Sequence, residues 1–142
     1  MRLVGAAMQI KNNRSIASAS VDMLCVNLFS GEADIFKFGA APTLVKTSSG
    51  VSVHTGESLS AGLRGDSENL PDHIRTRLPA GSTAVIVSDG VTGGEDVEWL
   101  CFELEKEKTA GREFARRVLE EAGRRFGSAD DMTVITVNVE KR

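Results

Sequence analysis

Acidic residues border two apolar segments of the chain, and their placement suits the binding of a cation. Asp89 follows an apolar segment that ends at Val87. Asp130 and Asp131 come directly before a second apolar segment, which begins at Met132. If these segments form neighbouring antiparallel strands, the end of the first and the start of the second lie at the same edge of a sheet. We therefore expect the three carboxylates to converge.

Clustered carboxylates repel one another unless a proton or a cation neutralises them, and hard oxygen ligands suit Mg²⁺ or Mn²⁺. Gly90 would let the backbone come close to such an ion and offers its carbonyl group. The alternative is structural, because Asp-Gly is a common turn dipeptide and an Asp-Asp pair before a strand is common at a surface. The residues alone leave Asp89, Gly90, Asp130 and Asp131 open to both interpretations.

Asp22 is a weaker candidate for such a site. It shares a strand face with Leu24 and Val26, where an ionised carboxylate is costly unless it is paired. Asp22 either accepts a hydrogen bond that supports a site or lies at a frayed strand end, and the second interpretation is favoured. His54 and His73 are isolated from other ligand types in the sequence, so the spacing of a zinc site is absent.

The elements that position these residues belong to a chain of 142 residues, a length that suits one domain. Apolar residues make up 41% and aromatic residues only 5%, so aliphatic side chains must build the core. The net charge of −3 lacks the basic field that draws proteins to nucleic acid. Cys25 and Cys101 lie in apolar surroundings without a CxxC pair, and we expect reduced packing residues of a cytoplasmic protein. No apolar run approaches the roughly 20 residues that span a bilayer, so membrane insertion is not indicated.

The hydrophobic pattern predicts a mixture of strands and helices. Strands are predicted over residues 21–29, 33–38, 43–46, 51–55, 74–78, 83–87 and 132–139, and helices over 2–10, 96–106 and 109–126. The first three strands follow one another at hairpin distances, which predicts an antiparallel meander. The first strand is apolar on both faces and therefore needs cover on both sides.

Four segments in this order resemble a known family: SVDMLCVNLFSGEADIFKFGAAPTLVK, ESLSAGL, AVIVSDGV and DDMTVITVNVE. Together they resemble the phosphatase domain of the sporulation stage II protein E family, a bacterial branch of the metal-dependent type 2C protein phosphatases. The resemblance covers essentially the whole chain. The pairing of Ser-Asp-Gly with Asp-Asp-Met-Thr, preceded by Gly-Ala-Ala-Pro, is far more specific than any one motif.

The resemblance implies an α+β fold, a four-layer α-β-β-α sandwich of two antiparallel sheets with helices outside. It implies a site with two ions, Mn²⁺ or Mg²⁺, that hydrolyses phosphoserine or phosphothreonine by in-line attack of water on phosphorus. By position, Asp89 and Asp130 are the implied catalytic metal ligands, with Gly90 and Asp131 as further members of the metal site. The implied substrate is a phosphorylated anti-sigma-factor antagonist of a sporulation or stress-response switch.

The sequence departs from the family at its start. The family's bridging aspartate belongs to an Asp-Gly motif on a strand before the helix with which this chain begins, and no residue here matches it. Ser60-Ala61-Gly62 also stands where the family has Pro-x-Gly. We therefore expect residues 1–142 to form a single, incomplete phosphatase domain, in the cytoplasm or in the cytoplasmic part of a longer membrane-anchored protein.

Three functions remain open on this basis. The chain is a phosphatase that is active together with the missing front part of the domain. Alternatively, it is a catalytically incomplete module that associates with another protein, with itself or with that front part. In the third interpretation it is a metal-free structural domain in which the aspartates are turn residues.

Overall fold

The computed structural model describes residues 18–62, 70–94, 96–127 and 130–140, and the helix predicted over 2–10 lies outside these ranges. The described strands are β1 (Val21–Val26), β2 (Glu32–Phe38), β3 (Thr43–Thr47), β4 (Gly50–His54), β5 (Asp72–Arg77), β6 (Thr83–Val87) and β7 (Val134–Asn138). The described helices are α2 (Asp89–Thr92), α3 (Glu98–Lys106) and α4 (Arg112–Phe126). None of the helices in the described ranges is long and apolar enough to cross a membrane.

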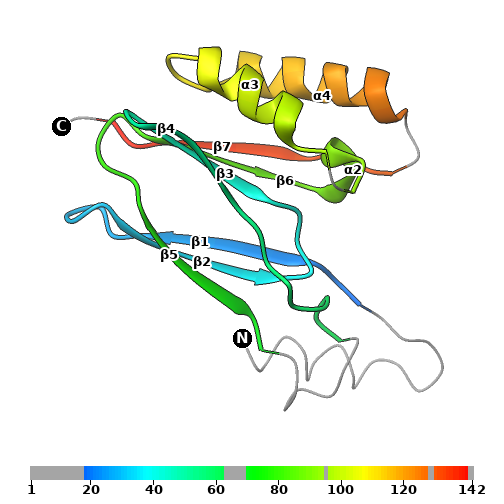
Figure 1. The fold of residues 1–142 in the computed structure, drawn as a ribbon, viewed down its shortest axis with the longest axis horizontal. Coiled ribbons are helices and arrows are strands. Elements are labelled where there is room, and N and C mark those ends of the chain that lie inside the picture. The colour runs from blue at the N-terminus through cyan, green and yellow to red at the C-terminus, as the bar shows by residue number, and fades with distance from the viewer. Residues whose placement is uncertain (1–17, 63–69, 95, 128–129, 141–142) are drawn as a thin grey trace.

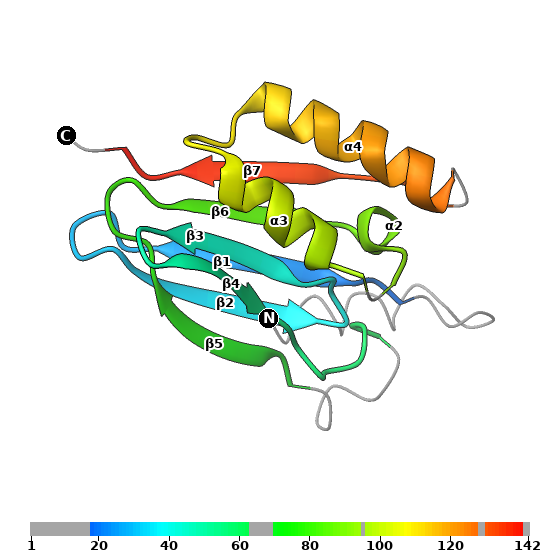
Figure 2. The ribbon, with the colours of Figure 1, turned by 45° about the horizontal axis from the view of Figure 1, so that its top comes forward.

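The strands form two antiparallel sheets that face each other (Figure 1). The strand order is β1-β2-β5 in one sheet and β4-β3-β6-β7 in the other. Helices α3 and α4 cover the outer face of the four-stranded sheet (Figure 2). The predicted α+β sandwich of two antiparallel sheets is confirmed, and the described residues supply two sheets and one helical layer of it.

The core has two parts because the four-stranded sheet is covered on both faces. Successive residues of a strand point to opposite faces, and in β3 both Leu44 and Val45 are buried. Leu44 belongs to the cluster beneath the helices, which includes Trp99 and Phe114. Val45 belongs to the cluster between the sheets, which includes Ile35. A sheet covered on both faces needs strands that are apolar throughout, which explains the uninterrupted apolar run of β6.

The predicted three-stranded meander is wrong at its second connection. β1 pairs with β2 as expected, but the second neighbour of β2 is β5, and β3 pairs with β4 and β6 in the other sheet. Residues 39–42 therefore carry the chain from one sheet to the other. Gly39 has a φ of +53°, which favours glycine, and its N–H donates to the carbonyl of Ser58 at 2.9 Å instead of to a hairpin partner.

The first predicted strand ends three residues earlier than expected. The side-chain oxygen of Asn27 accepts hydrogen bonds from the backbone N–H groups of Phe29 at 2.9 Å and Ser30 at 3.2 Å. This side-chain turn competes with the strand conformation. Leu28 and Phe29 consequently stand at the tip of the β1–β2 hairpin, with 75% and 96% of their surfaces exposed.

Both cysteines are free, as predicted, but only one of them packs. Cys101 lies against the core beneath the helices, and burial raises the pKa of its thiol. Cys25 is exposed on β1, so its prediction as a packing residue is wrong for the described structure. Its side chain lies on the face of the three-stranded sheet that points away from the other sheet, since β1 alternates inward and outward.

Candidate active site

The two acidic motifs meet at one edge of the four-stranded sheet. β6 and β7 are antiparallel neighbours, and Val87 at the end of β6 pairs with Val134 at the start of β7. The strand pairing expected from the sequence is therefore present. It places Asp89, two residues beyond β6, at the same edge as Asp130 and Asp131 before β7. Figure 1 shows the end of β6 next to the start of β7.

Ser88 connects the two motifs through three hydrogen bonds. Its backbone N–H donates to the carbonyl of Thr133 at 3.1 Å, and its hydroxyl donates to the carbonyl of Asp131 at 3.1 Å. The N–H of Thr133 in turn donates to the Ser88 hydroxyl at 2.9 Å. Sequence reasoning did not single out Ser88, although its place in the Ser-Asp-Gly motif was a usable signal.

Gly90 allows the motifs to approach each other closely. A Cβ atom at position 90 would lie 2.7 Å from the carbonyl oxygen of Asp131 and 3.3 Å from Cγ of Met132. Gly90 is part of the short helix α2, at a place where the sequence pattern predicted no helix. Its φ is not positive, so the need for glycine at this position is one of space and not of backbone conformation.

The carboxylates of Asp89 and Asp130 are exposed and only lightly hydrogen-bonded. Oδ1 of Asp89 accepts a hydrogen bond from the N–H of Gly90 at 3.1 Å. Oδ1 of Asp130 accepts one from the N–H of Asp131 at 2.8 Å. Within the described ranges, neither Oδ2 atom has a hydrogen-bond partner, so each carboxylate keeps an oxygen available for a cation.

Asp89 and Asp130 have the type of donor atom that a divalent cation prefers, but they are too few to complete its coordination. Mn²⁺ and Mg²⁺ prefer about six oxygen ligands, and carboxylate oxygens are among the preferred donors. Among the described residues, no group of three or more His, Cys, Asp or Glu side chains is placed to hold a metal ion. Asp89 and Asp130 therefore offer suitable donors for a divalent cation, but the described residues do not supply a full set of ligands.

Asp22 does not lie at a frayed strand end, so the favoured interpretation of this residue is wrong. Its side chain is only 9% exposed, and Oδ2 accepts hydrogen bonds from Nζ of Lys37 and from Oγ1 of Thr43, each at 2.6 Å. Lys37 is fully buried. The signal missed in the sequence was the position of Lys37 on the same face of β2 as the buried Ala33 and Ile35.

The two histidines remain apart, as the sequence indicates. His54 ends β4 and lies opposite Thr43, and burial together with the positive charge of Lys37 lowers the pKa of its imidazole. His73 is in the other sheet, where its ring stacks on Phe36 with centroids 4.5 Å apart. Nε2 of His73 lies 2.6 Å from Oδ1 of Asp34.

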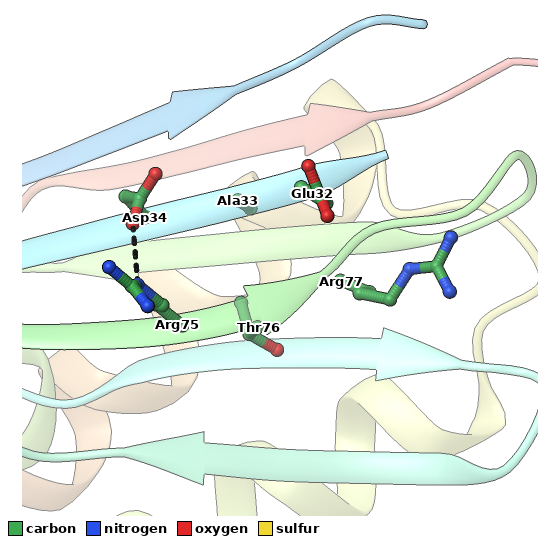
Figure 3. Close-up of a pocket in the computed structure, with 6 residues that line it drawn as sticks. All are labelled: Glu32, Ala33, Asp34, Arg75, Thr76 and Arg77. Atoms are coloured by element: carbon green, nitrogen blue, oxygen red, sulfur yellow. Dashed lines mark ion pairs between the residues drawn. The ribbon is translucent and has the colours of Figure 1, made fainter. Parts of the chain in front are cut away.

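A groove of about 550 Å³ lies on the three-stranded sheet (Figure 3). It is lined by Glu32, Ala33, Asp34, Arg75, Thr76 and Arg77. The acidic residues of β2 lie opposite the arginines of β5, and Nε of Arg75 is 3.9 Å from Oδ1 of Asp34. Because this groove is on the other sheet from the acidic motifs and its charges oppose each other, we place the candidate active site at the β6–β7 edge.

Several solved phosphatase structures share this fold. The phosphatase domain of the cell fate determinant SpoIIE from Bacillus subtilis has a TM-score of 0.73 and 23% identity, over 99% of this chain and 64% of that one. A structure of the same protein's PP2C phosphatase domain with a fragment of its regulatory domain has a TM-score of 0.78 and 23% identity, over 96% of this chain and 43% of that one. The catalytic domain of the serine/threonine phosphatase PstP in complex with two manganese ions has a TM-score of 0.75 and 16% identity. That match covers 99% of this chain and 66% of the PstP chain. The fold is thus that of the type 2C protein phosphatases.

The sequence itself identifies the branch of this class. The sequence model of the family described as Stage II sporulation protein E (SpoIIE) matches residues 2–140. The chain belongs to the Stage II sporulation protein E family. It spans 64% of the length of the SpoIIE phosphatase-domain chain that it matches. A search of curated proteins gives no significant match.

Proposed function

We propose that this chain forms part of a protein serine/threonine phosphatase that uses two divalent cations, Mn²⁺ or Mg²⁺. Its substrate is a phosphorylated anti-sigma-factor antagonist in the cytoplasm, within a sporulation or stress-response switch. The observation that carries the proposal is the pairing of β6 with β7, which brings Asp89 to the same edge of the sheet as Asp130 and Asp131. Membership of the SpoIIE family supports the reaction class.

Each residue of the edge has a distinct role in this proposal. Asp89 and Asp130 hold the cations through carboxylate oxygens, and Asp131 and the carbonyl of Gly90 belong to the same site. When bound, the cations neutralise charge on the phosphate oxygens and lower the pKa of water, which makes it a nucleophile at neutral pH. Ser88 keeps the two acidic motifs together through its hydrogen bonds to Asp131 and Thr133.

A second candidate function is a catalytically incomplete module that acts by association with a partner protein, with a second copy or with a further part of the phosphatase domain. It is favoured by the absence, among the described residues, of any group of three or more His, Cys, Asp or Glu side chains that is placed to hold a metal ion. In this proposal residues 1–142 form one domain whose site is completed by a carboxylate from outside the described ranges.

Phosphate release from a phosphoserine protein tests the first function. The 142-residue chain and a form extended at its N-terminus by the front part of a SpoIIE-family phosphatase domain are each assayed with Mn²⁺, on an anti-sigma-factor antagonist and on an unrelated phosphoprotein. We expect Asp89→Asn and Asp130→Asn each to lower kcat/KM of the active form by about 100-fold or more, because each removes a metal ligand. Glu103→Gln in α3, a helix that carries none of the proposed ligands, is the matched control and should retain activity.

The outcomes separate the candidate functions. Full activity in both aspartate variants would contradict the assignment of the site. If the 142-residue chain binds Mn²⁺ but releases no phosphate, while the extended form does, the incomplete module is supported. If neither protein binds Mn²⁺ in a calorimetric titration, the metal-free structural domain is supported.

A further inference from the structure

A buried polar cluster of Asp22, Lys37 and Thr43 joins the two sheets at the end that carries the candidate active site. We propose that this cluster is a positioning element, which holds the segment containing Asp89 in place through Ala41 and β3. Its importance for catalysis rests on the proposed function of that site. The placement itself is a property of the fold and can be tested separately.

Lys37 is the centre of the cluster. Its Nζ donates to Oδ2 of Asp22 at 2.6 Å, to the carbonyl of Ala41 at 2.6 Å and to Oγ1 of Thr43 at 2.9 Å. These three acceptors match the three hydrogens of an ammonium group. Lys37 and Thr43 are both fully buried, so the ammonium group and the hydroxyl group are shielded from bulk water.

Asp22 is held through one oxygen only. Its Oδ2 accepts the hydrogen bonds from both Lys37 and Thr43. Its Oδ1 is buried and has no hydrogen-bond partner among the described residues. The loss of either donor therefore leaves a buried carboxylate with a single partner, and the members of the cluster depend strongly on one another.

The cluster joins the two sheets by hydrogen bonds, which depend on direction, whereas the other contacts between the sheets are apolar. Asp22 and Lys37 are paired residues of β1 and β2, whereas Thr43 begins β3 in the other sheet. Within the described ranges, no other hydrogen bond joins a strand of one sheet to a strand of the other. The remaining contacts between the sheets are apolar, such as those of Ile35 and Val45, and apolar packing fixes relative position less specifically.

Two paths lead from the cluster to Asp89. Along the first, Thr43 pairs with Ile86 of β6, three residues before Asp89. Along the second, Ala41, whose carbonyl Lys37 binds, packs against the core cluster that contains Val87 and Val91. These two valines flank the Ser-Asp-Gly motif in the sequence. The start of β3 and helix α2 lie at the same end of the sandwich (Figure 2).

Hydrogen exchange of two backbone amides tests the placement. The N–H of Ser88 donates to Thr133 at 3.1 Å, and the N–H of Val91 donates to the carbonyl of Ser88 at 3.0 Å, so both report on the Asp89 segment. In the full-length protein, Thr43→Val removes the hydroxyl and keeps the shape of the side chain. We expect it to lower the protection of both amides by about tenfold, and Thr43→Ser, which retains the hydroxyl, by less than about twofold.

Thr83→Val is the matched control. Thr83 is a buried threonine of β6 whose hydroxyl donates to Asn138 at 2.7 Å, at the opposite end of the strand from Asp89. This variant should lower global stability to a similar extent while leaving the protection of the Ser88 and Val91 amides unchanged relative to the rest of the sheet. Equal protection of these amides in Thr43→Val and Thr83→Val would overturn the inference. If Thr43→Val does not fold, Asp22→Asn takes its place, with the same expectation.

Mn²⁺ titration of the same variants separates this inference from the proposed function. We expect Thr43→Val to weaken Mn²⁺ binding by about tenfold and Thr43→Ser to restore it, while Thr83→Val leaves it unchanged. If the wild-type protein binds no Mn²⁺, the proposed function fails, and the amide protection still decides the positioning role. If Mn²⁺ binds equally to all variants while protection falls, the cluster holds the segment but does not set the cation site, and the catalytic part of the inference is overturned.

Discussion

At the β6–β7 edge, uncharged residues bring the charged ones together. Ser88 accepts and donates hydrogen bonds across the edge, and Gly90 leaves the space that the carbonyl of Asp131 occupies. These contacts hold the segment that contains Asp89 against the segment that contains Asp130 and Asp131. The arrangement of the acidic residues therefore depends on neighbours that carry no charge.

Gly90→Ala tests this dependence. The added methyl group would lie 2.7 Å from the Asp131 carbonyl oxygen, so α2 and the start of β7 must move apart. We expect a loss of about 1–3 kcal/mol in the free energy of unfolding, measured with urea, and weaker Mn²⁺ binding. Gly123→Ala in α4 is the control, because a Cβ there meets nothing within 4 Å. It should stabilise the helix by about 0.5–1 kcal/mol, and unchanged stability in Gly90→Ala would contradict the packing argument.

Lys37→Met tests the energetics of the buried ion pair. It would leave the Asp22 carboxylate buried with Thr43 as its one donor, and we expect a loss of about 3–5 kcal/mol in the free energy of unfolding. The double variant Asp22→Leu, Lys37→Met removes both charges, so it should be more stable than Lys37→Met alone. Equilibrium unfolding of both proteins measures the difference. A double variant less stable than Lys37→Met would show that the pair is not the source of the effect.

At the scale of elements, the connection between β2 and β3 determines which residues meet at the end of the sandwich that carries the candidate active site. Residues 39–42 are as short as a hairpin loop, yet they leave one sheet and enter the other. The connection places Thr43 between its strand partners Ile86 and His54, where its hydroxyl accepts a hydrogen bond from Lys37. A connection of hairpin length fits either geometry, which is why the sequence predicted a meander.

His54 on β4 is the strand partner of Thr43, the first residue after the connection, and it makes the stability of the protein depend on pH. Burial and the charge of Lys37 lower the pKa of its imidazole from the ordinary value of 6.5. Below about pH 6.5 the unfolded chain therefore binds more protons at this position than the folded chain. The contribution of His54 to stability is constant above that pH and falls as the pH drops through it towards the folded pKa.

His54→Asn should remove this part of the pH dependence. We expect the free energy of unfolding of the wild type to fall more steeply than that of the variant between about pH 6.5 and 5.5, as measured in urea at several pH values. A proton titration of His54 by NMR gives the folded pKa directly. Parallel stability curves for the two proteins would contradict the prediction.

Other elements follow closely from the sequence. The predicted helix over residues 109–126 is observed as α4 (Arg112–Phe126), because its buried residues Phe114, Val118 and Ala122 recur at helical spacing. The predicted strand 83–87 matches β6 residue for residue. Strong periodicity and uninterrupted apolar runs are local properties, so they can be read without knowledge of the neighbours. Helix α2 escaped prediction because four residues are too few to show a period.

At the scale of the whole molecule, cation binding and folding are linked. A ligand that binds only the folded state stabilises it by RT ln(1 + [L]/Kd). Asp89 and Asp130 come together only when β6 pairs with β7, so the unfolded chain has no such site. The proposed function therefore makes a prediction about stability that does not require a substrate.

Addition of Mn²⁺ at 100 times its Kd should raise the free energy of unfolding by about 2.7 kcal/mol. A chelator should reverse the effect, and Asp89→Asn or Asp130→Asn should abolish it, whereas Glu103→Gln should retain it. Thermal unfolding with and without Mn²⁺ provides the measurement. Equal stabilisation of the wild type and both aspartate variants would place the cation elsewhere on the protein.

The sequence by itself determined the apolar strands, the main helix and the two acidic motifs at their ends, since each is a local pattern of residues. It also carried the family motifs that predicted two facing sheets. Only the tertiary structure decided the partners of Lys37, the role of Ser88 and the contact of Lys46, whose Nζ donates to the carbonyls of Leu104 at 2.9 Å and Glu105 at 2.8 Å. The physical reason is that a buried polar group must find its hydrogen-bond partners in three dimensions, and folding decides which strands, loops and helices supply them.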